Sequence, residues 1–168
     1  MGTSKSGRYM NTKGNRRHSS DFALVHSNEG KFRWRQSRDC KNGEKRIRLE
    51  SGGHGEDGRK LLDKYGIEYH IVKTYPNGVR VGCVPDCANK NKQKETGMSW
   101  FPASWDKKKI RRAGEHVAQL KRNANPQDGV PVFGMYKGVR VGVIMTNGQI
   151  GTIFPDSDQI RTNSRRKK

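Results

Sequence analysis

The chain has 168 residues, of which 30% are hydrophobic and 30% are charged. This length fits one domain with tails, and the apolar fraction is low for a chain that folds from end to end. The 35 Lys and Arg residues against 16 Asp and Glu give a formal net charge of +19, which indicates a polyanionic partner, first of all nucleic acid. No apolar run reaches the roughly 20 residues of a membrane span, and none follows the basic start as a secretory signal requires. We therefore expect no membrane partner and a place in the cytoplasm of a producing or target cell.

Residues 1–48 are predicted to be a basic arm that is partly disordered, because basic residues far outnumber acidic ones and apolar positions are scattered. Phe32 and Trp34 alternate with Arg33, Arg35 and Arg38. Such a pattern suits stacking on bases and pairing with phosphates. A short strand with alternate residues buried explains it equally well.

Residues 49–159 are predicted to form the folded domain, followed by a basic, disordered tail over 160–168. A Gly-rich loop over 51–55 leads to a short helical pattern that Gly66 ends as a left-handed cap. Residues 67–75 alternate as a half-buried strand, and the turn at 76–78 returns the chain into a second strand over 79–84. A polar loop follows over 86–97.

A second helix is expected to begin at a Ser104 cap and to reach Arg122, because apolar residues from Ile110 to Leu120 recur at helical spacing. Strands are expected at 132–133, 139–145 and 149–154, with a tight turn at 147–148. The pentapeptide Gly-Val-Arg-Val-Gly occurs at 78–82 and again at 138–142, either by chance or because two hairpins are built alike. Together these patterns predict an α+β fold of two small antiparallel sheets with flanking helices.

A disulfide framework is not indicated, because the chain has only a small and odd number of cysteines: Cys40, Cys83 and Cys87. The Cys83 to Cys87 spacing suits one half of a zinc site, but a second ligand pair is missing. We therefore expect free thiols and no metal site.

Two of the five histidines stand where a solvent-exposed site is expected. His54 lies in the Gly-rich loop, where the lack of side chains lets a phosphate approach the backbone. His70 shares the outer face of its strand with Glu68. Two imidazoles of pKa near 6.5 can accept and donate a proton at neutral pH, and a cation can stabilise the charge on phosphorus during RNA cleavage. From spacing alone, a structural role for each histidine is the more common alternative. His18, His26 and His116 are expected to be structural or solvated.

The positive end of the second helix is rich in basic residues, which is unfavourable for the helix dipole and points either to anion contact or to a solvated basic face. These residues are Lys107, Lys108, Lys109, Arg111 and Arg112.

Several motifs of the domain occur together in one known family. They are the Gly-Gly-His loop at His54, the strand with His70, the segment Tyr-Pro-Asn-Gly-Val at 75–79, the segment Ser-Trp-Phe-Pro-Ala-Ser-Trp at 99–105, and the segment Gly-Gln-Ile-Gly-Thr-Ile-Phe-Pro at 148–155. With these motifs, residues 50–159 resemble the bacterial EndoU nuclease domain of polymorphic toxins and phage head-associated proteins.

The resemblance implies metal-independent or metal-stimulated cleavage of single-stranded RNA or tRNA to a 2′,3′-cyclic phosphate, with no required cofactor. It implies that His54 and His70 form the acid/base pair, that a lysine before Ser99 completes the site, and that Thr152 faces the substrate phosphate. Lys94 is the nearest such lysine and is taken as the third catalytic residue, with Lys92 and Lys90 behind it as alternatives. Phe154 stands where the family has a tyrosine. The resemblance further implies an immunity protein as partner. Together with the basic composition, it indicates a substrate-binding set of Ser99, Lys92, Lys90, Lys109 and Arg112.

Three functions follow as hypotheses. The first is a toxin-type endoribonuclease, which the histidines, the charge and the motifs all favour. The second is a non-catalytic basic protein that binds nucleic acid, for which the net charge alone suffices. The third is a DNA-nicking nuclease on the same scaffold, which needs no 2′-hydroxyl in its substrate.

Overall fold

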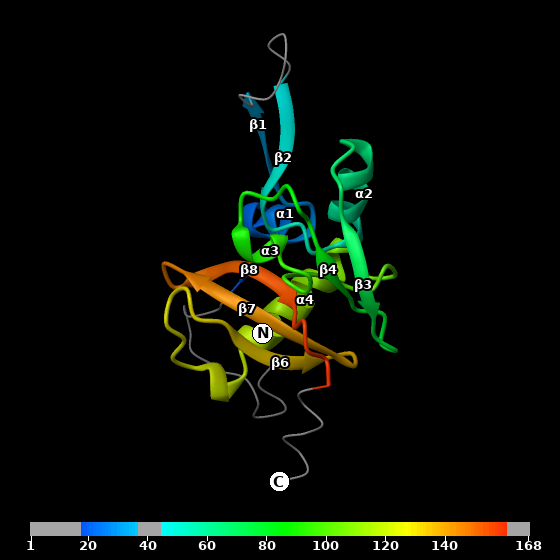
Figure 1. The fold of residues 1–168 in the computed structure, drawn as a ribbon. Coiled ribbons are helices and arrows are strands. Elements are labelled where there is room, and N and C mark those ends of the chain that lie inside the picture. Colours follow the sequence, from blue (N-terminus) through cyan, green and yellow to red (C-terminus); the bar gives the residue numbers. More distant parts are fainter. Residues whose placement is uncertain (1–17, 37–44, 161–168) are drawn as a thin grey trace.

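The computed structural model describes residues 18–36 and 45–160 and has the predicted α+β architecture (Figure 1). Its helices are α1 (Asp21–Asn28), α2 (Glu56–Lys64), α3 (Lys90–Gln93), α4 (Lys107–Ala118) and the 3₁₀ turn η3 (Lys121–Asn123). No helix in these ranges is long and apolar enough to cross a membrane.

The strands form three small antiparallel sheets in the described ranges, one more than predicted. The first is the hairpin of β1 (Lys31–Gln36) and β2 (Lys45–Ser51); the second contains β3 (His70–Thr74), β4 (Arg80–Cys83) and β5 (Met98–Trp100); the third contains β6 (Val132–Tyr136), β7 (Val139–Thr146) and β8 (Gln149–Pro155). The predicted turns at 76–78 and 147–148 join β3 to β4 and β7 to β8. Both hairpins are therefore confirmed, each as part of a three-stranded sheet.

Residues of the predicted arm contribute to the fold. The hydroxyl of Ser20 caps α1 by accepting from the amide of Ala23 at 3.1 Å, and Ser27 Oγ accepts from the amide of Ile153 in β8 at 2.9 Å. β1 pairs with β2, with Trp34 opposite Ile47, so the segment is a strand as the second interpretation predicts, but Trp34 is exposed and not buried. Residues 1–17, 37–44 and 161–168, which include Arg38, Cys40 and most of the predicted tail, lie outside the described residues.

Helix α4 begins later and ends earlier than predicted. Its cap is Asp106, whose carboxylate accepts from the amide of Lys109 at 2.8 Å, whereas Ser104 is exposed before the helix. A carboxylate at this end also favours the helix dipole, which offsets the basic first turn. The helix ends at Ala118, and the expected last turn is the separate η3.

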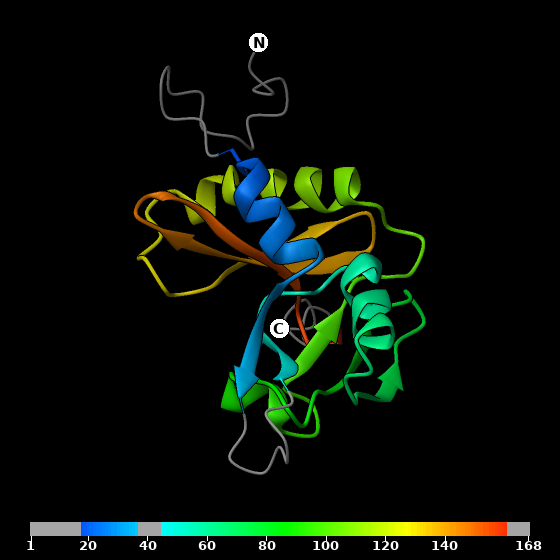
Figure 2. The same cartoon turned by 90° about the horizontal axis from the view of Figure 1, so that it is seen from above.

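The molecule has two hydrophobic cores. In Figure 2, α1 and α4 lie side by side over one face of the β6–β7–β8 sheet, and their apolar side chains, such as Leu24, Ile110 and Val117, form the larger core there. The smaller core lies between the first two sheets and α2, around Leu62 and Trp100. Residues between the two cores are therefore held from both sides.

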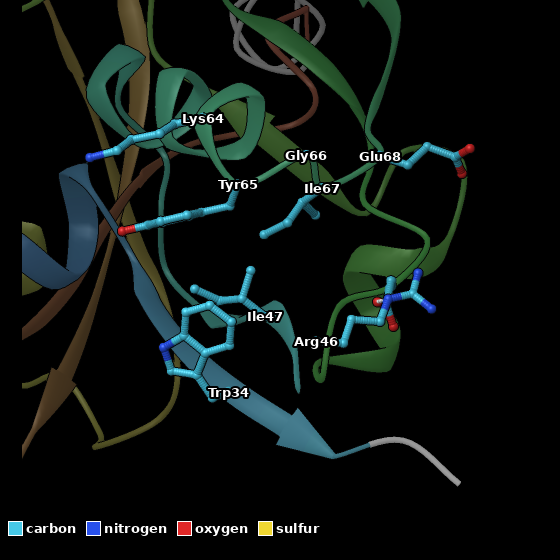
Figure 3. Close-up of a pocket in the computed structure, with 9 residues that line it drawn as sticks. Trp34, Arg46, Ile47, Lys64, Tyr65, Gly66, Ile67 and Glu68 are labelled. Carbon is cyan, nitrogen blue, oxygen red and sulfur yellow. Dashed lines mark ion pairs between the residues drawn. The ribbon is translucent and has the colours of Figure 1, made fainter. Parts of the chain in front are cut away.

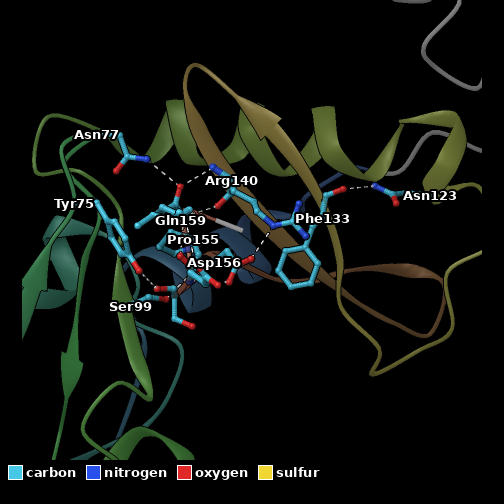
Figure 4. A network of polar contacts seen from close by, with 12 residues as sticks. Tyr75, Asn77, Ser99, Asn123, Phe133, Arg140, Pro155, Asp156 and Gln159 are labelled. Atoms are coloured by element: carbon cyan, nitrogen blue, oxygen red, sulfur yellow. Dashed lines mark hydrogen bonds and ion pairs between the residues drawn. The ribbon is translucent and has the colours of Figure 1, made fainter. Parts of the chain in front are cut away.

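Hydrogen bonds join the second sheet to the third and to the segment after it (Figure 4). Ser99 Oγ in β5 donates to the carbonyl of Pro155 at the end of β8 at 2.8 Å, and Tyr75 Oη donates to the carbonyl of Ser157 at 2.8 Å. These bonds fix the position of β5 relative to β8.

The two Gly-Val-Arg-Val-Gly segments place their arginines alike. Arg80 lies 2.7 Å from the Glu56 carboxylate and Arg140 lies 2.7 Å from that of Asp156, and both guanidinium groups are largely buried. Each sheet thus carries a buried arginine with an acidic partner.

Candidate active site

The loop that carries His54 is bonded to the end of α1. The amide of Gly53 donates to the carbonyl of His26 at 3.0 Å, and the amide of His54 donates to that of Ser27 at 2.6 Å. Gly52 has φ +71°, and a Cβ there would strike the His26 carbonyl and lie 3.2 Å from Cε1 of the His26 ring. Glycine is therefore required for the loop to approach this closely, and the approach brings two histidines from distant segments together.

The imidazole of His54 is buried and held on both nitrogens. Nδ1 lies 2.8 Å from the carbonyl oxygen of Ser99, and Nε2 lies 3.2 Å from Nζ of Lys92. Because a carbonyl only accepts, Nδ1 carries the hydrogen and Nε2 presents its lone pair to the ammonium group. The ring of Phe154 packs against the imidazole at 5.8 Å between centroids.

Lys92 projects from the short helix α3 into the same place and is 7% exposed. Its Nζ donates to the carbonyl of Gly52 at 2.8 Å and lies 3.4 Å from Sδ of Met98. Among the described residues it has no carboxylate partner. Burial therefore lowers the pKa of Lys92 to about 8.

Both histidines are biased toward their neutral forms. Burial, and next the charge of Lys92, hold the pKa of His54 well below its usual value. The same two causes, with a smaller contribution from Lys31, lower the pKa of the half-buried His26. His54 is thus a neutral proton acceptor at neutral pH.

We call His26, His54 and Lys92 the junction cluster, because it lies between the end of α1, the Gly-rich loop and α3. Two imidazoles that can transfer protons and one ammonium group that can neutralise an anion are present together. The buried setting strengthens each electrostatic interaction.

His70 is not part of this cluster. It begins the edge strand β3, opposite Cys83, with its side chain 58% exposed and Nε2 3.4 Å from the carboxylate of Glu68. No described contact joins it to His54. The structure thus brings His54 together with His26, which was expected to be structural, instead of with His70.

Of the three lysines at every second residue from 90 to 94, the structure brings Lys92 to His54. Lys90 and Lys94 are exposed at the two ends of α3. In a helical turn, side chains two residues apart point in different directions, so an alternating pattern cannot place all three at one site. Lys94, the expected third catalytic residue, has no described contact with the cluster.

Ser99 contacts His54, and Thr152 shares a strand face with a residue that does. Ser99 supplies its carbonyl oxygen to the imidazole, while its hydroxyl, which was expected to bind substrate, donates to Pro155. Thr152 is half-buried in β8, two residues before Phe154 and therefore on the same face of the strand. That face is the one that packs on His54.

The two basic residues of α4 that were expected to bind substrate lie elsewhere. Lys109 lies over the ring of Trp105, 5.0 Å from its centroid, and Arg112 is exposed. Neither has a described contact with the junction cluster.

Residues 18–36 and 45–160 contain no group of three His, Cys, Asp or Glu side chains arranged to hold a metal ion. Cys83 and Cys87 are free thiols, and burial raises the pKa of the Cys87 thiol.

The sequence contains a signal for His26 that composition obscured. Ser20 is a good helix cap, and Ala23, Leu24 and Ser27 follow at helical spacing on the side that the structure buries. A helix over residues 20–28 that packs on the domain makes His26 a candidate site residue.

Comparison with known families identifies the family of the chain. A model of the bacterial EndoU nucleases matches residues 26–157. The chain belongs to the bacterial EndoU nuclease family. The matched region begins at His26 and includes all three residues of the junction cluster. Neither a search of curated proteins nor a search of solved structures found a significant match.

Proposed function

We propose that this nuclease is an endoribonuclease that cleaves single-stranded RNA or tRNA by attack of a 2′-hydroxyl on the adjacent phosphate, at the junction cluster. The observation that carries the proposal is the contact of His54 Nε2 with Nζ of Lys92 at 3.2 Å, with His26 beside them. Two proton-transfer groups and one cation are what this reaction needs, and it needs no metal.

The three residues have separate roles in the proposed reaction. When Lys92 turns from His54 to the bound phosphate, Nε2 of neutral His54 is free to accept the proton of the 2′-hydroxyl, whose oxygen forms a new bond to phosphorus. Protonated His26, favoured by the negative charge of the bound phosphate, gives its proton to the 5′-oxygen as the bond from phosphorus to that oxygen breaks. Lys92 neutralises the additional negative charge on the phosphoryl oxygens. The products are a 2′,3′-cyclic phosphate and a 5′-hydroxyl.

The chemistry of the cut ends tests this proposal. Labelled RNA is incubated with the protein in EDTA, and the 3′ ends are examined for a cyclic phosphate. A substrate with a 2′-deoxy residue at the cut position is the matched control, because it lacks the nucleophile. Cleavage of the control, or a requirement for a divalent ion, would instead indicate a DNA-nicking nuclease. If the RNA stays intact, the hypothesis of a non-catalytic nucleic-acid-binding protein is favoured.

The partner expected from the family resemblance remains part of the proposal. An immunity protein that inhibits this nuclease has to block access to the junction cluster, where the half-buried His26 is the most open of the three side chains. Co-expression with a candidate inhibitor should therefore abolish cyclic-phosphate formation.

A further inference from the structure

A second site-like feature lies outside the junction cluster, between the β1–β2 hairpin and the end of α2 (Figure 3). It is a cavity of about 390 Å³, lined by Trp34 and Ile47 from the hairpin and by Lys64 and Tyr65 from the helix end. This volume is at the lower end of the range for small-molecule sites, about 300–1,000 Å³. No residue of the junction cluster lines it.

Two aromatic rings line this cavity. Tyr65 lies on the helix side and Trp34 on the hairpin side, with the Ile47 side chain between them (Figure 3). The Trp34 side chain is 62% exposed, and Tyr65 is held at an edge-to-face contact with Phe32, 5.2 Å between centroids. A large exposed indole suits stacking on a flat ring at its open face.

The rim of the cavity is polar and carries both charges. Arg46 lies 3.0 Å from the Asp86 carboxylate, Lys64 lies beside the Tyr65 ring, and Glu68 reaches the far side. Cations at a rim bind phosphates, while carboxylates accept hydrogen bonds from ring N–H and amino groups. Arg46 and Glu68 already have partners in Asp86 and His70, so a ligand phosphate would have to add to or replace these contacts.

We propose that this cavity binds one unpaired base of a single-stranded nucleic acid, stacked on Trp34, as a subsite separate from the cleavage site. A base has a flat face for the exposed indole and an attached phosphate for the cations Arg46 and Lys64. The chain's charge of +19 favours the same polyanion. The identity of that strand as RNA rests on the proposed function.

Tryptophan fluorescence tests the proposal directly. Of the three tryptophans, Trp34 is exposed, whereas Trp100 is 0% and Trp105 is 5% exposed. Addition of nucleoside monophosphates to the full chain should therefore quench the emission of Trp34, and ribose 5-phosphate, which has no base, should not. Equal effects of both ligands, or no quenching by the nucleotides, would overturn the proposal.

Variants separate stacking from charge. A 2′-deoxy oligonucleotide is used, so that binding is measured without cleavage. Trp34→Ala should weaken its binding about 5- to 150-fold, and Trp34→Phe should retain most of the affinity. The slope of log affinity against log salt should stay unchanged in both, because no charge is removed. Ile160→Ala, which also truncates an exposed apolar side chain, is the control.

The two proposals fail separately. Quenching and Trp34-dependent binding without any RNA cleavage would support the proposed subsite and contradict the proposed catalysis. RNA cleavage by the Trp34→Ala protein with unchanged affinity for the oligonucleotide would contradict the subsite and support the catalysis. Thermal unfolding confirms that this variant is folded. Binding of an apolar peptide in place of nucleotides would overturn the subsite as proposed.

Discussion

The junction cluster and the edge strand β3 show how differently two histidines can be placed in one small domain. His54 is 7% exposed and fixed on both ring nitrogens, whereas the His70 side chain is 58% exposed with one acidic neighbour. Only the first lies between two hydrophobic cores, where water is excluded and a neighbouring charge acts strongly. The proposed function places its proton acceptor in the first environment.

The sharpest test of this contrast is removal of each histidine. His54→Ala and His26→Ala should each lower RNA cleavage about 10²- to 10⁴-fold, because each removes a general acid or base. His70→Ala is the matched control and should cleave at the rate of the unaltered protein. Rates are measured on labelled RNA with thermal unfolding as a check of folding. A large loss in His70→Ala with little change in His26→Ala would reverse the assignment.

The lysines give the second test. Lys92→Ala should lower kcat about 10²- to 10³-fold, the usual effect of removing one group that stabilises the developing charge. Lys94→Ala removes the same charge from an exposed position at the end of α3 and should leave kcat unchanged. Equal losses in the two variants would mean that overall charge, and not the position of Lys92, supports cleavage.

The pH dependence of cleavage gives the third test of this contrast. Lys92 loses its proton above pH about 8, since burial lowers its pKa, and the cation is then absent from the reacting phosphate. We expect kcat/KM to fall about tenfold per pH unit above that value. A rate that stays constant to the ordinary range of lysine would contradict the role of Lys92. The Lys94→Ala protein should show the same profile as the unaltered one.

Much of the fold could be predicted because its signals are local. The turn at 76–78, Gly66 with φ +65°, and the apolar spacing of α4 each act within a few residues. Residues 20–28 were predicted as part of a disordered arm, because the basic composition around them outweighed their few apolar residues. Strand β5, with three residues, has too little sequence to be recognised.

The candidate site was predictable in part, for the same reason. His54 stands in a distinctive loop, but its neighbours come from α1 and α3, and their approach depends on backbone contacts such as that of Gly53 with His26. A pairing of this kind between distant segments leaves no periodic pattern in the sequence. The selection of Lys92 over Lys94 depends on a single helical turn inside a polar loop.

Acid stability gives a fourth test of the contrast between the histidines. His54 has a lower pKa in the folded protein than in the unfolded chain, so below pH about 6.5 the unfolded chain binds the additional proton and stability falls. The loss attributable to His54 is at most about 1.4 kcal/mol per pH unit. It should be smaller in His54→Asn and unchanged in His70→Ala, as measured by chemical denaturation at neutral and mildly acidic pH. The same acid loss in His54→Asn would mean that His54 is not buried as a neutral ring.

The smallest expected effect concerns a hydroxyl group in each region. Thr152 lies on the face of β8 that packs on His54, whereas Thr74 is exposed on the strand of His70. If Thr152 donates one hydrogen bond to the bound phosphate, Thr152→Val should lower kcat/KM about three- to tenfold, the effect of a single hydrogen bond. Thr74→Val makes the same chemical change and should have no effect. Because valine keeps the shape and strand preference of threonine, a fall in the first variant alone would assign the Thr152 hydroxyl to the substrate and extend the junction cluster onto β8.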